Sequence, residues 1–218
     1  DFYFARPTNA LMPEQANFGG DKGLERTCKV GSYESNLLGL NDMHGNVHEW
    51  CDDAKKATDG ASLRVARGGV WNNVTGDCRA AYRNTLPPSH RLDNLGLRLA
   101  RVPSGTPSPE AKTPPLAVAP FNADKAKAHQ EAWAKHLGVP VEFENKLGMT
   151  FRLIPPGEFQ MGIDSNDVDT SKWNPPPSWQ GEWLKERWPN AIAGASPRHS
   201  VKLTRAYYIQ THEVRHGW

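Results

Sequence analysis

The sequence predicts an α+β fold of short, mostly antiparallel strands joined by much irregular structure. The 218 residues include 19 Gly and 18 Pro, which break regular structure and place turns throughout the chain. Several short segments alternate apolar and polar residues, as half-buried strands do, whereas a single segment has helical spacing. Eight Trp are available to anchor the loops. We therefore expect a loop-rich globular protein and not a helical bundle.

The composition excludes two classes of partner. The 26 Lys and Arg against 24 Asp and Glu leave a net charge of +2 with no basic run, so we expect no nucleic-acid partner. No stretch approaches the about 18 apolar residues that a membrane span requires.

Three Cys are too few for a disulfide framework and leave the cellular compartment open. Strand-like sequence stands at both ends without a signal peptide, so we expect a fragment of a longer protein.

A Pro-rich stretch at residues 103–120 divides the chain. Six of its 18 residues are Pro, and most of the others are Ser, Thr, Ala and Gly. This composition cannot bury enough apolar surface to fold, so we expect an extended linker.

Residues 121–138 follow the linker and carry the signals of one helix. Asn122 is a good N-cap, and Gly138 suits the position just after the last turn. Four residues spaced by three or four form a narrow stripe: Ala126, His129, Trp133 and Leu137. His129 and His136 could share a face, but no third metal ligand stands near them in the sequence. We therefore expect a surface helix and not a metal site.

The remaining sequence predicts short strands. Residues 149–153 alternate apolar and polar side chains and are expected to form a hairpin with residues 159–162. Residues 163–197 form a long Trp-containing stretch that we expect to be an ordered loop, and residues 201–209 resume strand character. Before the linker, short strands are expected at residues 64–67, 78–83 and 95–102.

Three groups of residues carry a resemblance to a known family. The first is GLNDMHGNVHEW at residues 39–50. The second combines RGGVW at 67–71, CRAAYR at 78–83 and LGLRLA at 95–100. The third is GMTFRLIPPGEFQMG at 148–162, with residues 199–201 and 213–214. Together these motifs resemble the formylglycine-generating enzyme family, whose members are also called sulfatase-modifying factors.

This resemblance implies an irregular fold related to the C-type lectin, with its parts in an unusual order. Residues 1–102 resemble the C-terminal half of the family's domain, whereas residues 139–218 resemble its N-terminal part. We therefore expect half of one copy, the linker at 103–120, the helix at 121–138 and the beginning of a second copy. A circular permutant is the alternative, although the family's middle motif is missing from this sequence.

The resemblance implies a chemistry for which this sequence lacks the residues. Family members oxidise a substrate cysteine to formylglycine with O₂, copper and a pair of active-site cysteines that precede the CRAAYR motif. Here residues 72–77 contain no Cys, and amide or hydroxyl side chains cannot supply the soft thiolates that Cu(I) requires. We expect no catalytic residue in this sequence. An oxidoreductase that depends on copper or non-haem iron is the alternative, with its catalytic residues outside this sequence.

The resemblance also implies calcium. The first site would combine two carboxylates and two backbone carbonyls, from Asp42, Glu49, Gly45 and Val47. Ca²⁺ prefers such a set of hard oxygen ligands. A second site would use Asn17 and the carbonyl of Phe18. The alternative without a metal is that Asp42 caps a turn and Glu49 forms a salt bridge.

We therefore expect a calcium-stabilised accessory or binding module within a larger bacterial multidomain protein. Its partners would be neighbouring domains of the same protein, such as a kinase, or a protein or peptide substrate. Glycan binding rests on fold analogy alone. Cys51 and Cys78 either form a disulfide or are two buried thiols, and His48 is expected to be buried and neutral.

Overall fold

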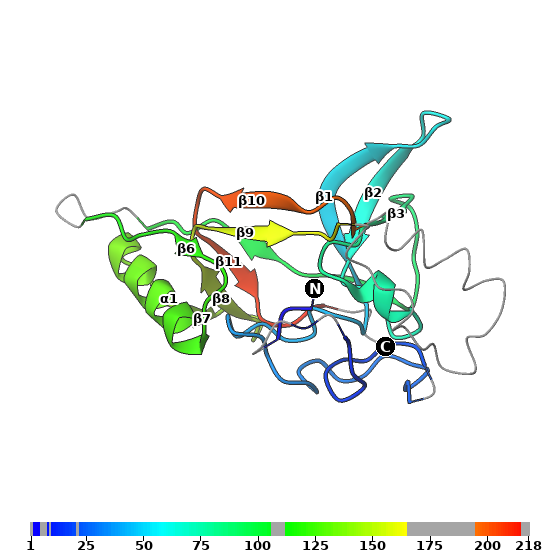
Figure 1. Cartoon of the computed structure of the whole chain (residues 1–218), viewed down its shortest axis with the longest axis horizontal. Helices are drawn as coiled ribbons and strands as arrows, with labels where there is room; N and C mark the ends of the chain where they lie inside the picture. Colours follow the sequence, from blue (N-terminus) through cyan, green and yellow to red (C-terminus); the bar gives the residue numbers. More distant parts are fainter. Residues whose placement is uncertain are drawn as a thin grey trace.

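The computed structural model describes residues 2–4, 8, 10–20, 22–105, 112–164 and 195–214. This part of the chain is dominated by short strands, with one α-helix at one side of them (Figure 1). It is a mixed fold with long irregular connections. No described helix is both long and apolar enough to span a membrane.

The first sheet has the order β3-β2-β1-β4 and comes entirely from the part of the chain before the Pro-rich stretch. Its strands are β1 (His48–Lys56), β2 (Ser62–Arg67), β3 (Asn84–Leu86) and β4 (Leu95–Leu97). β1 pairs with β2 in antiparallel and with β4 in parallel orientation. The hairpin of β1 and β2 projects from the rest of the molecule (Figure 1).

The other two sheets join segments that are distant in the sequence. One has the order β10-β9-β6 and the other β5-β11-β8-β7. Their strands are β5 (Ala100–Arg101), β6 (Ala117–Val118), β7 (Glu142–Glu144), β8 (Thr150–Ile154), β9 (Gly157–Met161), β10 (His199–Leu203) and β11 (Tyr207–Gln210). β5 precedes the Pro-rich stretch, yet it pairs with β11 close to the end of the chain. Residues 1–102 and 139–218, the two segments that resemble parts of the family's domain, therefore share a sheet.

The predicted hairpin of residues 149–153 and 159–162 is wrong. β8 and β9 form at these positions, but β8 pairs with β7 and β11, whereas β9 pairs with β6 and β10. Ala117 N–H donates to Pro156 O at 2.9 Å, so β6 occupies one edge of β9 from its first residue onward. Neighbours from elsewhere in the sequence thus fill both edges of β9.

The Pro-rich stretch is not a linker along its whole length. Its residues 117–118 form β6, and Ala117 is buried. Residues 106–111 lie outside the described part of the chain, as do residues 165–194 of the predicted Trp-containing loop. The strand expected at 78–83 is also wrong, because the short 3-10 helix η1 (Thr75–Cys78) ends there and pairing begins only at Asn84.

The helix α1 (Ala123–Leu137) agrees with the sequence prediction. Asn122 Oδ1 accepts the Lys125 N–H at 3.0 Å, and Gly138 ends the helix in the left-handed conformation at φ 64°. Trp133 packs in a core with Phe151, among other residues of β8 and β11. α1 therefore covers the sheet that contains segments from both halves of the chain.

Candidate functional site

The loop that carries the GLNDMHGNVHEW motif surrounds the buried side chain of Arg98. Arg98 Nε lies 2.9 and 3.1 Å from the two carboxylate oxygens of Glu49, and Arg98 Nη2 lies 2.6 Å from Glu49 Oε1. The same Nη2 is 3.5 Å from Glu213 Oε2. The side chains of Arg98 and Glu213 are each 1% exposed. We call Arg98, Glu49 and Glu213 the Arg98 cluster.

Arg98 also binds three backbone carbonyls. Nη1 donates to Gln210 O at 3.1 Å and to Thr211 O at 2.8 Å, while Nη2 donates to Asn41 O at 2.8 Å. A guanidinium has five N–H donors, and this arrangement satisfies them with oxygen atoms from both halves of the chain. Arg98 is therefore the central polar connection between the motif loop and the segment that follows β11.

Among the carboxyl groups of this site, that of Glu213 has the largest shift in pKa. It accepts a hydrogen bond from Asn46 Nδ2 at 2.5 Å. Burial, and then the nearby charge of Asp42, raise its pKa to about 7, against the opposing effects of Asn46 and Arg98. Arg98 offsets little of this shift because its closest contacts are to Glu49 and not to Glu213.

The structure places the two acids of the first predicted calcium site in contact with protein groups. Asp42 adopts a left-handed conformation at φ 54°, and its Oδ2 accepts the Gly31 N–H at 2.6 Å. Glu49 pairs with Arg98. These contacts are those expected of a turn cap and a salt bridge. Burial raises the pKa of Asp42.

Two backbone carbonyls of the motif loop lie near Gly68. Gly68 has φ 90°, and a Cβ at this position would lie 3.7 Å from Val47 O and 3.8 Å from Met43 O. Gly45 N–H donates to Gly68 O at 2.7 Å, which holds the loop against this glycine. The Val47 and Met43 carbonyls therefore both lie near Gly68, whereas the Gly45 carbonyl of the predicted site is not among these neighbours.

The second predicted site contains a buried oxygen that has no hydrogen-bond partner. Asn17 is 2% exposed, and its Nδ2 donates to Arg26 O at 2.9 Å and to Asn46 Oδ1 at 3.2 Å. Its Oδ1 finds no partner among the described residues. The carbonyl of Phe18 faces Gly23, where a Cβ would approach it to 2.8 Å. Within the described ranges, no three His, Cys, Asp or Glu side chains are grouped so that they could hold a metal.

Most of the segment at 72–77 is packed into the protein, although Asn72 is exposed. Val74 and Asp77 are each 1% exposed, and Asn73 is 6% exposed. Cys78 directly follows it and is completely buried, and burial raises the pKa of its thiol far above the usual range. Cys51 and Cys78 are free thiols, so the disulfide alternative for this pair is not what the structure contains.

Sequence reasoning missed His44 and gave Arg98 no role. The His44 ring lies 5.2 Å from those of Phe2 and Phe4. Its Nε2 accepts the Tyr3 N–H at 3.0 Å, and its Nδ1 lies 2.8 Å from Cys78 O. Burial lowers the pKa of His44 to about 4, so the side chain is neutral. Its partners come from distant segments, and no local pattern identifies them.

His48 lies where it was expected. It is 5% exposed, and its ring nitrogens lie 3.3 Å from Arg67 O and 3.2 Å from Asn84 Nδ2. The prediction of a buried histidine is confirmed.

Comparison with known proteins connects the motif-containing half to one family. Residues 6–103 match the family model described as the sulfatase-modifying factor enzyme 1-like domain. The chain is 36% identical over 90 residues to the serine/threonine-protein kinase Pkn1 of Chlamydia trachomatis serovar L2, which covers 34% of the chain and 15% of the kinase. It is 34% identical over 102 residues to the kinase pkn1 of Chlamydia caviae, covering 40% of the chain and 16% of the kinase.

The similar proteins also include one that is not a kinase and two with solved structures. The chain is 31% identical over 78 residues to the chaperone protein LppX of Paenibacillus barcinonensis, covering 35% of the chain and 28% of LppX. Among solved structures, Treponema denticola variable protein 1 is 31% identical with a TM-score of 0.34, covering 38% of this chain and 34% of that one. CarF is 27% identical with a TM-score of 0.35, covering 38% and 31%. The chain spans less than a third of each of these curated relatives.

Proposed function

We propose, from the match of residues 6–103 to the sulfatase-modifying factor family, that this segment serves as a non-catalytic accessory module of a larger bacterial multidomain protein. The observation that carries this proposal is the absence of Cys at residues 72–77. The Pkn1 relatives support it, because the similar segment makes up only 15–16% of each kinase.

The burial of Cys51 and Cys78 also favours a non-catalytic role. Copper(I) binding requires exposed or readily ionised soft ligands. Cys78 is completely buried, and burial raises the pKa values of both Cys78 and Cys51. Raised thiol pKa values disfavour the thiolate that metal binding and nucleophilic attack need. The alternative remains an oxidoreductase dependent on copper or non-haem iron, whose catalytic groups come from outside this sequence.

The experiment is an oxidation assay with the chain and a cysteine-containing peptide of the sulfatase type. The protein is incubated with copper, reductant and O₂, and the peptide is then examined by mass spectrometry. We expect no conversion to formylglycine above a control without protein. Conversion above that control which disappears in the Cys51→Ser or Cys78→Ser variant would instead refute the non-catalytic role.

In this proposal, residues 1–102 and 139–218 together form one module. β5 pairs with β11, and Leu97 exchanges backbone hydrogen bonds of 2.9 and 2.7 Å with Val214. Arg98 and Glu213 add a buried ion pair. A module formed by halves of two consecutive copies, or by one circularly permuted copy, would have these connections.

Calcium is proposed as a structural ligand of the same module. The first site would use the Asp42 and Glu49 carboxylates with the Gly45 and Val47 carbonyls. The GLNDMHGNVHEW motif at residues 39–50 supports it, and Ca²⁺ prefers such a set of hard oxygen ligands. Glu49 is its weakest member, because Arg98 already neutralises that carboxylate.

The second proposed calcium site would use Asn17 Oδ1 and the Phe18 carbonyl. The unpartnered, buried Asn17 Oδ1 supports this placement, because a buried acceptor without a partner is costly unless something binds it. At either site the ion would stabilise the loop and would take no part in a reaction.

A further inference from the structure

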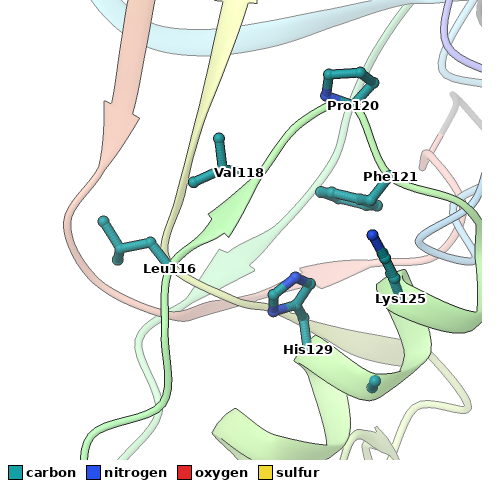
Figure 2. Close-up of a pocket in the computed structure, with 7 residues that line it drawn as sticks. Leu116, Val118, Pro120, Phe121, Lys125 and His129 are labelled. Carbon is teal, nitrogen blue, oxygen red and sulfur yellow. The ribbon is translucent and has the colours of Figure 1, made fainter.

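A pocket of about 370 Å³ lies between β6 and the first turns of α1 (Figure 2). Its volume falls within the about 300–1,000 Å³ typical of small-molecule sites. The side chains that matter here are Leu116, Val118, Pro120, Phe121, Lys125 and His129. They all follow residues 6–103, so the pocket is separate from the segment that matches the family model.

One part of the pocket is apolar and accessible. Val118 is 58% exposed although it belongs to a strand. Phe121 lies beside it in the pocket, with its ring centroid 5.7 Å from that of His129 (Figure 2). A single exposed valine is ordinary, but here it lines the same concave site as an aromatic ring. This part would bind an apolar or aromatic body.

The α1 side of the pocket carries two nitrogen-bearing side chains. Lys125 and His129 are four residues apart on α1, so they share one face of the helix, and both project toward Phe121 (Figure 2). Lys127 lies on another face and is 3.9 Å from Glu131. Among the ion pairs of the described residues, none involves Lys125. Lys125 is therefore available to an anion.

The walls of the pocket are fixed by contacts outside it. Trp133 Nε1 donates to Pro115 O at 3.1 Å, which holds α1 against the segment that leads into β6. Ala119 N–H donates to Glu158 O at 2.9 Å on the other side. Gln130 Nε2 donates to Leu153 O at 3.0 Å and anchors the helix to β8. A preformed site loses less conformational entropy when a ligand binds.

We propose that this pocket binds a small carboxylic acid with an apolar or aromatic body. The body packs against Val118 and Phe121, and the carboxylate pairs with Lys125 and accepts a hydrogen bond from His129.

The test uses 3-phenylpropionate as the probe and the full chain as the receptor. A titration followed by ¹H–¹⁵N correlation spectra is expected to move the amide signals of Val118, Phe121, Lys125 and His129 in a saturable way. The uncharged analogue 3-phenylpropionamide is expected to bind about fivefold more weakly, because it cannot form the charge-assisted contact. The Lys125→Gln variant is expected to bind the acid about three- to fivefold more weakly, since the pair is partly exposed to solvent.

Two further variants separate the charged from the apolar contribution. Lys127→Gln removes one charge from the same helix outside the pocket and is expected to leave binding unchanged. Val118→Thr keeps the shape of the side chain but reduces its apolar surface. It is therefore expected to weaken the binding of 3-phenylpropionate and of 3-phenylpropionamide to the same extent. The proposal is overturned by the absence of saturable shifts up to about 10 mM probe. Equal affinity for the acid and the amide also overturns it. So does an equal loss of affinity for the acid in Lys125→Gln and Lys127→Gln.

Discussion

Arg98 holds Glu49 through two guanidinium nitrogens, with a closest distance of 2.6 Å, while its side chain is 1% exposed. Replacing Arg98 by Met keeps much of the volume but leaves Glu49 and Glu213 without their cation. We expect the free energy of unfolding to fall by about 3–5 kcal/mol, because a buried charge is left uncompensated. Urea denaturation measures this loss.

The matched control for that experiment is Arg64→Met. Arg64, like Arg98, forms an ion pair with a carboxylate. Its partner is Asp52 at 3.0 Å, and that carboxylate is fully exposed. We expect little change in the urea midpoint. A similar loss in both variants would mean that the Arg98 cluster contributes no more than a surface pair.

Gly45 and Gly60 allow steric contact to be separated from backbone strain. Their φ values are 83° and 84°, so an Ala is equally strained at both positions. A Cβ at Gly45 would lie 2.1 Å from Asn17 O, whereas a Cβ at Gly60 would meet nothing within 4 Å. We expect Gly60→Ala to cost about 1 kcal/mol and Gly45→Ala about 3 kcal/mol or more. Equal costs in thermal or urea unfolding would contradict the close approach at Gly45.

The two halves of the chain should remain associated after the connection between them is cut. Replacing residues 106–111 with a protease recognition sequence allows cleavage without removing a described contact. The paired strands β5 and β11 and the Leu97–Val214 bridge are expected to hold both pieces in one peak in size-exclusion chromatography. Introducing Arg98→Met is expected to promote their separation. Pieces that elute separately without any substitution would refute a shared module.

His44 should make the protein less stable in mild acid. Burial lowers its folded-state pKa from 6.5 to about 4, so between these values the unfolded state binds more protons. The contribution is fully present at neutral pH and is lost as pH falls from 6.5 toward 4, by about 3 kcal/mol in total.

Glu213 has the opposite pH dependence over an overlapping range. Its pKa rises from 4.5 to about 7 on folding, so the stability it contributes is lost as pH increases through this interval. The test is therefore the difference between the native protein and His44→Gln, which can still donate one hydrogen bond and accept another. A difference that does not change between pH 4 and 6.5 would mean that folding does not lower the pKa of His44.

Calcium should raise the melting temperature if the proposed sites bind it. An ion at a hundredfold above its dissociation constant stabilises the folded state by about 2.7 kcal/mol. For a chain of this length, that corresponds to a shift of about 5–10 °C. The measurement compares calcium with chelator in the absence of magnesium, and identical melting temperatures would exclude both sites.

Variants assign such a shift to one site or the other. Glu49→Gln is expected to remove most of it if the first site binds, whereas Asp42→Asn removes less because an amide oxygen can still act as a ligand. Asn17→Ala tests the second site. Each variant is compared with itself in calcium and in chelator, so that any disturbance of the Arg98 cluster cancels. Asp52→Asn is the surface control.

Local signals explain what the sequence could predict. The ends of α1 were found because Asn122 and Gly138 act within a few residues of the backbone groups that they satisfy or terminate. Strand character at β8, β9, β10 and β11 followed from alternation along each segment.

Pairing partners could not be predicted in the same way. Alternation shows that β9 is a strand, but it does not show that β6 and β10 occupy its edges. The site has the same limitation. The motifs pointed to Asp42 and Glu49, but the cation that neutralises Glu49 comes from β4's end, and Glu213 comes from beyond β11.

The separation of Arg98 from Glu213 also affects how the chain is made. Glu213 is synthesised 115 residues after Arg98, which takes about 6–23 s at the usual rate of about 5–20 residues per second. During this time β5 cannot pair with β11, and the edges of the unfinished sheets stay open to other chains. A nascent chain of this protein should therefore depend on protection at the ribosome until β11 emerges.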